Sequence, residues 1–297
     1  MNLCLDNHLT ERARLWLGTL VSMRVEGLPQ AEAHAAIDAA FADVAVIHRL
    51  MSFHDADSDV SRLNREGARQ AVQVHPWTYC VLEEAQRFSF ASDGYFDISV
   101  GAELVDWELL PHPAGATGVP EGSWRDIELL PGNRVVFHRP LWIDLGGIAK
   151  GFAVDQATDR LRTHGALDIV VNAGGDIRVQ GAIAEPIRLG AASTADTMPV
   201  LELSEGSIAG SRGYRQRHWY DGRWWGPHVN AITRAPASTD RFVCVLAERC
   251  MVADALTKVV MAVGAGSANL LREFSASAYM HDPSDGWKVL EAEENLA

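Results

Sequence analysis

Asp144-Leu-Gly-Gly-Ile-Ala-Lys-Gly-Phe-Ala-Val-Asp155 is the stretch that decides the fold, and Asn172-Ala-Gly-Gly-Asp176 follows it closely. The first stretch combines a carboxylate, two glycines, a lysine and the start of a helix with apolar residues at helical spacing. Gly146 and Gly147 let the backbone turn tightly and approach a ligand. The free N–H groups and positive dipole end of the helix would face that ligand, and Lys150 adds a mobile charge. This combination predicts a seat for a phosphorylated ligand.

These residues also leave a simpler alternative open. A Gly-Gly pair before a helix can be a plain connection from a strand, with Lys150 as a solvated surface residue. The glycine spacing matches neither the Rossmann nor the P-loop pattern, so those two binding mechanisms do not transfer to this chain.

The rest of the chain predicts an α+β fold with mixed, largely antiparallel sheets and packed helices. With 297 residues, 47% of them hydrophobic, it can bury one large core or two lobes. We expect helices over 31–51, 76–92, 150–164, 252–263 and 268–274. We expect strands over 14–26, 134–137, 141–143, 167–171, 176–180, 187–193, 199–203 and 241–247. A proline- and glycine-rich loop, 111–123, would join lobes 12–110 and 124–297 of a single domain, 12–297.

Charge and cysteine content exclude several classes of function. The net charge of −13 argues against a broad nucleic-acid surface, which needs a clustered basic face. An acidic protein that binds a polyanion needs a local cation, and this favours a bound divalent metal. The four cysteines have neither zinc-ligand nor C-x-x-C spacing, so we expect free, buried thiols in a reducing compartment.

The N-terminal residues show neither a basic segment nor an apolar run, and Cys4 does not follow an apolar run. If Met1 is the native start, we expect no signal peptide, no lipidated cysteine and a cytoplasmic location. We also expect no membrane span, because the sequence shows no 18-residue apolar stretch.

Five segments of this chain match motifs of a known family, in the same order along the sequence. They are Met51-Ser-Phe-His-Asp-Ala-Asp-Ser-Asp-Val-Ser-Arg-Leu-Asn64, Asp93-Gly-Tyr-Phe-Asp97, the 144–155 stretch with its 172–176 turn, Ile208-Ala-Gly-Ser-Arg-Gly-Tyr-Arg215, and Ala253-Asp-Ala-Leu-Thr-Lys258. Together they resemble the ApbE family of FAD:protein FMN transferases over roughly residues 12–275. The resemblance implies an ApbE-like fold and Mg²⁺-dependent transfer of FMN from FAD to a threonine or serine hydroxyl of an acceptor flavoprotein. The product would be a phosphoester, and AMP would leave.

The resemblance implies a metal site, and one residue of that site differs between this chain and the family. By position, Mg²⁺ would be held by Asp254, by the backbone carbonyl of Gly147 and by a threonine four residues after the aspartate. Here that fourth residue is Lys258, and Thr257 lies three residues on. Since both positions share a helix face with Asp254, Thr257 could still reach the metal, or Lys258 could supply part of the missing charge. Without the resemblance, Asp254 would simply compensate a helix dipole.

The resemblance also implies a catalytic set and a flavin site. His228 is the leading proton acceptor, Asp176 a weaker one, and Lys150 would hold phosphate oxygens. The residues expected to line the flavin site are Met51, Ser52, His54, Asp97, Lys150, Asn172, Gly174, Gly175 and His228.

Each of these roles has a structural alternative. Asp97, Asn172 and Asp176 could be turn residues that accept backbone N–H bonds, and His228 could be a polar residue packed beside Trp224 and Trp225. Ser58 is more simply a helix N-cap. His54 stands where the family has a tyrosine, and its imidazole would stack on a flavin ring more weakly than a phenol.

Two rival functions remain. In an FAD pyrophosphatase, water would replace the acceptor hydroxyl and give free FMN and AMP. A non-catalytic FAD-binding protein is suggested by departures from the family pattern at Lys258, Gly210 and 230–234. The sequence does not reveal the acceptor.

Overall fold

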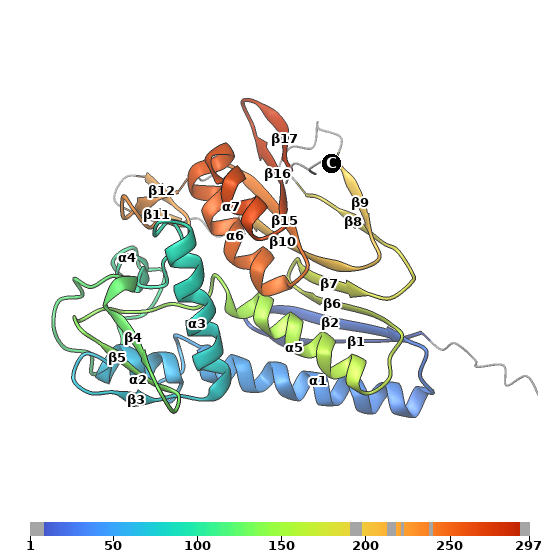
Figure 1. The fold of residues 1–297 in the computed structure, drawn as a ribbon, viewed down its shortest axis with the longest axis horizontal. Helices are drawn as coiled ribbons and strands as arrows, with labels where there is room; N and C mark the ends of the chain where they lie inside the picture. The colour runs from blue at the N-terminus through green and yellow to red at the C-terminus, as the bar shows by residue number, and fades with distance from the viewer. Residues whose placement is uncertain (1–8, 191–197, 213–217, 221–222, 238–239, 292–297) are drawn as a thin grey trace, which may run out of the picture.

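An eight-stranded antiparallel sheet forms the centre of the molecule (Figure 1). The computed structural model describes residues 9–190, 198–212, 218–220, 223–237 and 240–291. The strand order is β1-β2-β6-β7-β10-β15-β16-β17, and every neighbouring pair is antiparallel. The strands are β1 (Thr10–Trp16), β2 (Thr19–Glu26), β6 (Asp168–Ala173), β7 (Asp176–Gln180), β10 (Gly206–Arg212), β15 (Phe242–Ala247), β16 (Ser277–Asp282) and β17 (Gly286–Leu290). This confirms the predicted α+β fold.

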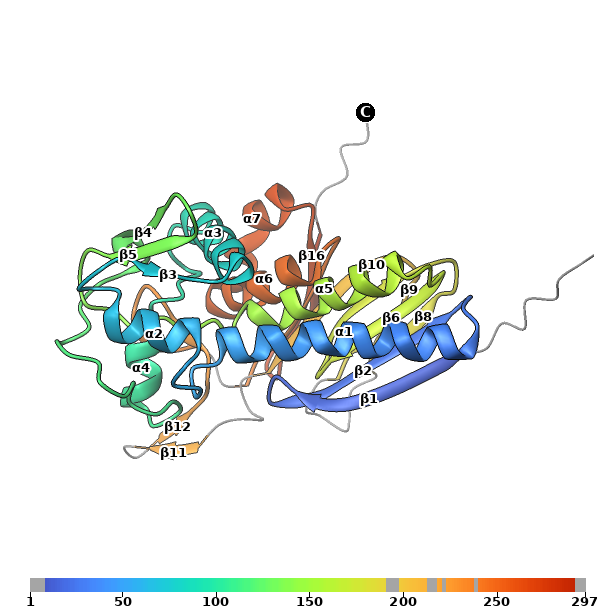
Figure 2. The ribbon, with the colours of Figure 1, turned by 90° about the horizontal axis from the view of Figure 1, so that it is seen from below.

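Three helices cover one face of this sheet (Figures 1 and 2). They are α1 (Gln30–Met51), α5 (Ala149–Thr163) and α6 (Cys250–Val263). α1 packs on β1 and β2, α5 on β6 and β7, and α6 on β10 and β15, while α5 contacts both other helices. A 3-10 turn, η2 (Gly264–Ser267), leads from α6 into α7 (Ala268–Glu273). The helices predicted over 31–51, 150–164, 252–263 and 268–274 match α1, α5, α6 and α7 within a few residues.

A second group of elements lies beside the sheet and helices, at the left of Figure 1. It contains α2 (Asp59–Glu66), α3 (Pro76–Ala91), α4 (Gly101–Asp106), η1 (Trp124–Asp126) and a small sheet of β3 (Val72–Gln73), β5 (Arg134–Phe137) and β4 (Ile127–Leu130). Ser58 caps α2 by accepting the Ser61 N–H, and Pro76 occupies the first turn of α3, as predicted. One hydrophobic cluster joins α3, α5, α6 and β15, so the two groups share a core. The division into lobes at 111–123 stays a prediction.

Three short two-stranded ladders complete the described fold. They pair β8 (Glu185–Arg188) with β9 (Val200–Leu203), β11 (His218–Tyr220) with β12 (Arg223–Trp225), and β13 (Val229–Asn230) with β14 (Ala235–Pro236).

The single strand predicted over 14–26 is wrong, because this segment lies within a hairpin of β1 and β2. Leu17 and Gly18 form its turn with φ of 56° and 71°. A two-residue hairpin turn with both φ values positive matches the twist of the flanking strands. Leucine rarely adopts this conformation, so the sequence lacked the usual Asn-Gly turn signal.

The strand predicted over 141–143 is also wrong, although Leu141, Trp142 and Ile143 are buried as expected. The side chain of Asn64 takes the place of a neighbouring strand. Its Oδ1 accepts the Ile143 N–H at 2.7 Å, and its Nδ2 donates to the Ile143 carbonyl at 3.0 Å. Buried backbone groups need a partner of some kind, and here an amide side chain satisfies both.

Helices α5 and α6 cap each other at their N-termini. The Asp155 carboxylate on α5 accepts the N–H groups of Cys250 and Met251, at 2.9 and 3.0 Å. The Asp254 carboxylate on α6 accepts the Gly151 N–H of α5 at 3.2 Å. Neither helix has a side-chain cap from its own N-cap residue, so this exchange satisfies N–H groups that would otherwise be orphaned. It also fixes the N-termini of α5 and α6 side by side.

The close approach of these helices depends on Gly151. A Cβ there would lie 2.4 Å from the Cys250 carbonyl oxygen and 2.7 Å from the Met251 Cα. Because these are backbone atoms, Gly151→Ala must push the helices apart, and we expect the free energy of unfolding to fall by about 1–3 kcal/mol. Urea denaturation followed by circular dichroism measures this. Gly266→Ala is the control, since its Cβ would meet nothing closer than 3.7 Å; equal stability of the two variants would contradict the close approach.

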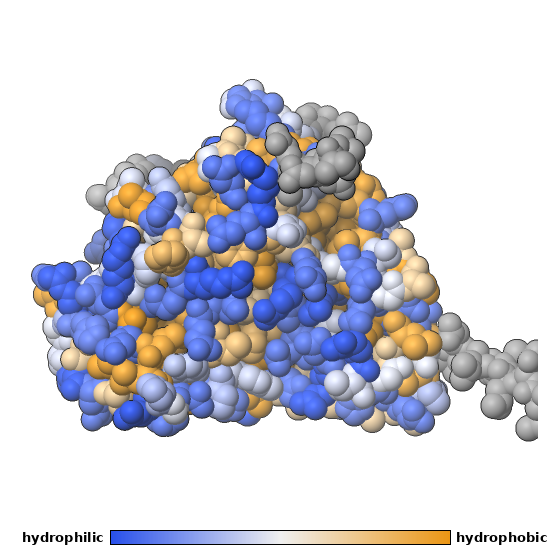
Figure 3. Space-filling model, in the orientation of Figure 1, coloured by the Kyte–Doolittle hydropathy of each residue, from blue (hydrophilic) through white to orange (hydrophobic). Residues whose placement is uncertain are grey.

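Among the described residues, one helical stretch is long and apolar enough to cross a membrane. It is Cys250–Glu273, with a mean hydropathy of 1.4, so the expectation that the chain has no such stretch is not confirmed. However, 67% of its apolar window is buried inside the protein, as is usual for a core helix. The face in Figure 3 is largely hydrophilic, with smaller hydrophobic areas. A cytoplasmic location stays a prediction.

The thiols of Cys80, Cys244 and Cys250 are free, as predicted. Cys244 and Cys250 are buried as expected, whereas Cys80 is half-buried. Cys4 lies outside the described residues.

Candidate active site

The N-terminus of α5 brings the predicted phosphate-binding residues together. Lys150, in the first turn, bonds to the Asp176 carboxylate, and its Nζ lies 3.6 Å from Asp254 Oδ2. The two carboxylates are almost fully buried, whereas 31% of the Lys150 side chain is exposed. The Lys150 side chain thus reaches the surface in part, while its ammonium bonds to a buried carboxylate.

The turn between β6 and β7 holds Asp176 in place. Gly174 and Gly175 adopt φ of 66° and 105°, which favour glycine. Asn172 Oδ1 accepts the Gly175 N–H at 2.9 Å across the turn. Asn172 thus acts as a turn residue that accepts a backbone N–H, which is one of the two roles considered from the sequence. Its contact with a flavin stays a prediction.

Lys258 brings a second ammonium to the cluster. It lies one helical turn after Asp254 on α6, and its Nζ is 2.5 Å from Asp254 Oδ1. It also donates to Thr257 Oγ1 at 2.9 Å and lies 3.4 Å from Ser211 Oγ of β10. Asp254 is therefore bridged between two lysines, and 21% of the Lys258 side chain is exposed. The sequence places Ser211 in the fourth family-like segment but predicts no contact for it, because only the packing of β10 against α6 brings it to Lys258.

Burial and charge together set the protonation of the cluster. Burial alone would raise the pKa of Asp254, but the Lys150 and Lys258 ammonium groups hold it below the ordinary value. Burial raises the pKa of Asp176, against the opposing charge of Lys150. Burial alone would lower the pKa of Lys150, yet Asp176 and Asp254 raise it above the ordinary value. Lys150 is therefore a permanent cation at neutral pH.

His228 lies just before β13 and is influenced by the same charges. Burial, with the Lys258 and Lys150 charges, lowers the pKa of His228 to about 3, and Asp254 partly opposes this. The imidazole is therefore neutral at pH 7, as a proton acceptor must be. A pKa this far below 7 also makes it a weak base in this arrangement, so its role as the proton acceptor stays a prediction.

The lowered pKa of His228 has a measurable consequence for stability. The unfolded imidazole takes up a proton near pH 6.5, but the folded one only near pH 3. The unfolded state binds more protons within this window, so His228 weakens the fold as the pH falls through it. We therefore compare the melting temperature of His228→Asn with that of the unmodified protein. The variant should become more stable relative to the unmodified protein as the pH falls from 6.5 to 4, and the difference between the two melting temperatures should be constant above about pH 7. A difference in melting temperature that stays constant over the whole range would contradict the lowered pKa of the half-buried His228.

The residues expected at the flavin end occupy the loop after α1. Met51 is buried at the end of the helix, and Ser52 Oγ accepts the N–H groups of His54 and Asp55 at 3.2 and 3.3 Å. His54 is exposed. Burial raises the pKa of Asp144, and the Gly146 N–H and the charges of His54 and Lys258 oppose the shift. Asp144 thus links this loop electrostatically to the lysine cluster.

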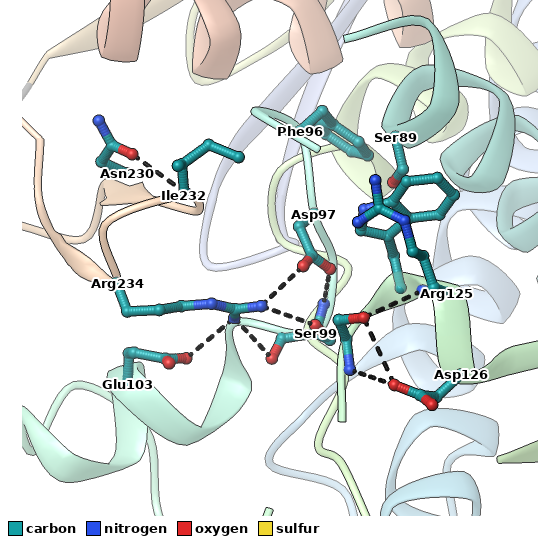
Figure 4. A network of polar contacts seen from close by, with 12 residues as sticks. Ser89, Phe96, Asp97, Ser99, Glu103, Arg125, Asp126, Asn230, Ile232 and Arg234 are labelled. Atoms are coloured by element: carbon teal, nitrogen blue, oxygen red, sulfur yellow. Dashed lines mark hydrogen bonds and ion pairs between the residues drawn. The ribbon is translucent and has the colours of Figure 1, made fainter. Parts of the chain in front are cut away.

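Asp97 belongs to a separate network, shown in Figure 4. Arg234 reaches from the β13–β14 segment and bonds to Asp97 Oδ2 at 2.8 Å, and it also contacts Ser99 and Glu103. The Ser99 N–H donates to Asp97 Oδ1 at 2.7 Å. Burial still raises the pKa of Asp97. The sequence identified Asp97 and Arg234 separately, but it held no signal that they pair across the fold.

A cavity of about 230 Å³ adjoins this network, between Arg234, Glu103 and the segment 120–123. None of the residues predicted to be catalytic, to bind flavin or to hold a metal is among the described residues that line this cavity. Tyr214 and Arg215 of the fourth motif lie outside the described residues.

The residues predicted to hold Mg²⁺ are close together but do not fit a divalent cation as arranged. A Cβ on Gly147 would lie 3.2 Å from Lys258 Cε, so the lysine stem runs against this glycine. The Lys258 ammonium then lies among the oxygens of Asp254 and Thr257. In the part of the chain that the structure describes, no three His, Cys, Asp or Glu side chains form a group that could hold a metal.

The fold and the site define an α+β protein with a cluster of lysines and buried carboxylates at two paired helix N-termini. The ApbE family model matches residues 17–280, so this chain belongs to the ApbE family. The FAD:protein FMN transferase of Treponema pallidum is 29% identical over an alignment 294 residues long, and the match covers 89% of this chain and 81% of the relative. The FAD:protein FMN transferase of Vibrio cholerae is 28% identical over an alignment 239 residues long, and the match covers 72% of this chain and 69% of the relative.

Solved structures show the same fold. The ApbE protein of Thermotoga maritima superposes with a TM-score of 0.84 at 24% identity, over 96% of this chain and 97% of that one. The flavin transferase ApbE of Vibrio cholerae gives a TM-score of 0.80 at 22% identity, over 97% and 98%.

Proposed function

We propose that this protein transfers FMN from FAD to a threonine or serine hydroxyl of an acceptor protein, and that AMP leaves. The observation that carries the proposal is a pair of lysines with partly exposed side chains, Lys150 and Lys258, whose ammonium groups bond to buried carboxylates beside a helix N-terminus. Such a group of donors suits a dianionic diphosphate. Membership of the ApbE family, whose curated relatives are named as FAD:protein FMN transferases, supports FAD as the substrate.

The reaction forms and breaks one bond at phosphorus. The acceptor hydroxyl oxygen bonds to the phosphorus on the FMN side of FAD. The bond from that phosphorus to the bridging oxygen breaks, and AMP leaves with its electron pair. We assign the hydroxyl proton to His228, because its imidazole is neutral at pH 7. The charges of Lys150 and Lys258 lower its proton affinity, and a diphosphate bound at the two lysines would offset them. Asp176 is the weaker acceptor, since its carboxylate already pairs with Lys150.

The flavin would extend from the lysines toward the loop after α1. His54 is exposed there and offers a ring for stacking, with Met51 and Ser52 shaping the loop. Asn172, Gly174 and Gly175 would line the opposite side through the β6–β7 turn. Asp97 would act through its pair with Arg234, because its carboxylate is buried in that network.

Magnesium dependence, which the family resemblance implies, stays a prediction. Gly147, Asp254 and Thr257 are the residues that would hold the ion. We assign no step to it, because the Lys258 ammonium lies among those oxygens.

Product analysis tests the proposal against its two rivals. The protein is incubated with FAD, alone and with an acceptor that carries a target threonine, and FAD, FMN and AMP are separated by chromatography. The transferase requires AMP release that depends on the acceptor. Equal amounts of free FMN and AMP without an acceptor would indicate a pyrophosphatase. Bound but intact FAD would indicate a binding protein and overturn the proposal.

A further inference from the structure

Lys258 lies in a cage of oxygen atoms. Its Nζ is 2.5 Å from Asp254 Oδ1, 2.9 Å from Thr257 Oγ1, 3.1 Å from the Asp254 carbonyl oxygen and 3.4 Å from Ser211 Oγ. Asp254 and Thr257 are fully buried, and Ser211 is 5% exposed. An ammonium has three donors and no acceptor, so a cage made only of acceptor oxygens suits it.

Two features of the chain fix the ammonium in this cage. Lys258 follows Asp254 by four residues on α6, a spacing that places both side chains on one helix face. The lysine stem then runs past Gly147, where a Cβ would lie 3.2 Å from Lys258 Cε and 3.5 Å from Cγ. The absence of a side chain at Gly147 therefore gives the stem its path.

The oxygens of the cage have few free lone pairs for another cation. Asp254 Oδ2 accepts the Gly151 N–H at 3.2 Å and faces Lys150 at 3.6 Å. Thr257 Oγ1 donates to the Asp254 carbonyl at 2.7 Å and bonds to Ser211 Oγ at 2.8 Å. Mg²⁺ needs oxygens at about 2.0–2.1 Å in near-octahedral order. An ion at that distance from Asp254 Oδ1 would lie against the ammonium, so the two cations exclude each other.

We infer that the Lys258 ammonium is the resident cation of this site, and that it excludes a divalent metal. With Lys150 it forms a fixed pair of charges on either side of Asp254, and both lysine side chains are partly exposed. The two positive charges attract a diphosphate without a metal, while the N–H donors of Lys258 stay bonded to the oxygens of the cage. FAD cleavage by this chain then proceeds in the presence of a chelator. The statement about FAD rests on the proposed function, whereas the statement about the cation does not.

Metal binding is measured first, by electron paramagnetic resonance of Mn²⁺ added to chelator-treated protein. We expect the unmodified protein to bind no stoichiometric Mn²⁺. Lys258→Thr removes the ammonium and adds a hydroxyl, and it should gain one Mn²⁺ site and a melting temperature that rises with MgCl₂. Lys288→Thr, at an exposed lysine, is the matched control and should behave like the unmodified protein. Stoichiometric Mn²⁺ binding by the unmodified protein would overturn the inference even if Lys258→Thr does not fold.

AMP release from FAD is measured second. We expect the unmodified protein to release AMP at the same rate with chelator and with MgCl₂. With chelator, the rate of AMP release by Lys258→Thr should be about 100-fold lower than that of the unmodified protein, because one charge at the phosphate is missing. The rate should recover when MgCl₂ is added. Loss of AMP release from the unmodified protein with chelator, restored by MgCl₂, would contradict the inference. If no form releases AMP under any condition, the proposed function fails, while the Mn²⁺ result still decides whether Lys258 excludes the metal.

Discussion

Asp254→Ala is expected to lower the free energy of unfolding by about 3–5 kcal/mol, as breaking a buried ion pair typically does. The carboxylate is fully buried and contacts Lys150, Lys258 and the Gly151 N–H at once. Its removal leaves two ammonium groups facing each other and an uncapped helix N-terminus. Urea denaturation followed by circular dichroism measures the loss.

The control for this variant is Asp285→Ala, which breaks an ion pair between half-exposed side chains. Surface pairs of this kind contribute about 0–1 kcal/mol. Asp254→Asn tests the effect of the charge alone. Its amide oxygen can still accept the Gly151 N–H, but the amide carries no negative charge to pair with Lys150 and Lys258. Equal stability of Asp254→Ala and Asp285→Ala would show that the cluster is not held together by Asp254.

Lys150→Met is expected to reduce AMP release from FAD by about 100- to 1,000-fold, the usual cost of one donor to a developing oxyanion. Methionine keeps the length of the side chain and removes its charge. The ammonium of Lys150 is held by Asp176 at the N-terminus of α5, whereas Lys258 bonds to the other side of Asp254. Steady-state kinetics with FAD and an acceptor measures the loss.

Lys288→Met is the matched control for Lys150→Met, since Lys288 is on the surface and pairs only with Asp285 among the described contacts. Melting curves show whether both variants fold. A folded Lys150→Met protein that keeps its turnover within about 10-fold would remove Lys150 from the phosphate site.

The sequence revealed those parts of the site that depend on neighbours along the chain. The glycines, Lys150 and the apolar spacing after it predicted α5, and Asn172 to Asp176 predicted the turn that meets it. These signals are local, because a turn and a helix start are decided within a few residues. The hairpin turn at Leu17 and Gly18 is local too, but its residues do not carry the usual signal.

The rest of the site depends on contacts between distant segments. Ser211 meets Lys258 because β10 packs against α6, and Arg234 meets Asp97 from another part of the chain. Asn64 replaces a strand partner for Ile143 through a side chain that no periodicity marks. The position of Lys258 in the sequence showed a departure from the family pattern, but only the structure places its ammonium among the oxygens of Asp254 and Thr257.

The most direct test of the proposed function is the mass of an acceptor protein after incubation with this protein and FAD. The acceptor is a flavin-carrying redox subunit with a target threonine, and a threonine-to-alanine version serves as its control. We predict a gain equal to FMN minus water on the threonine form alone, with one AMP released for each modified acceptor. An unmodified acceptor together with intact FAD, or with free FMN and AMP, would contradict FMN transfer.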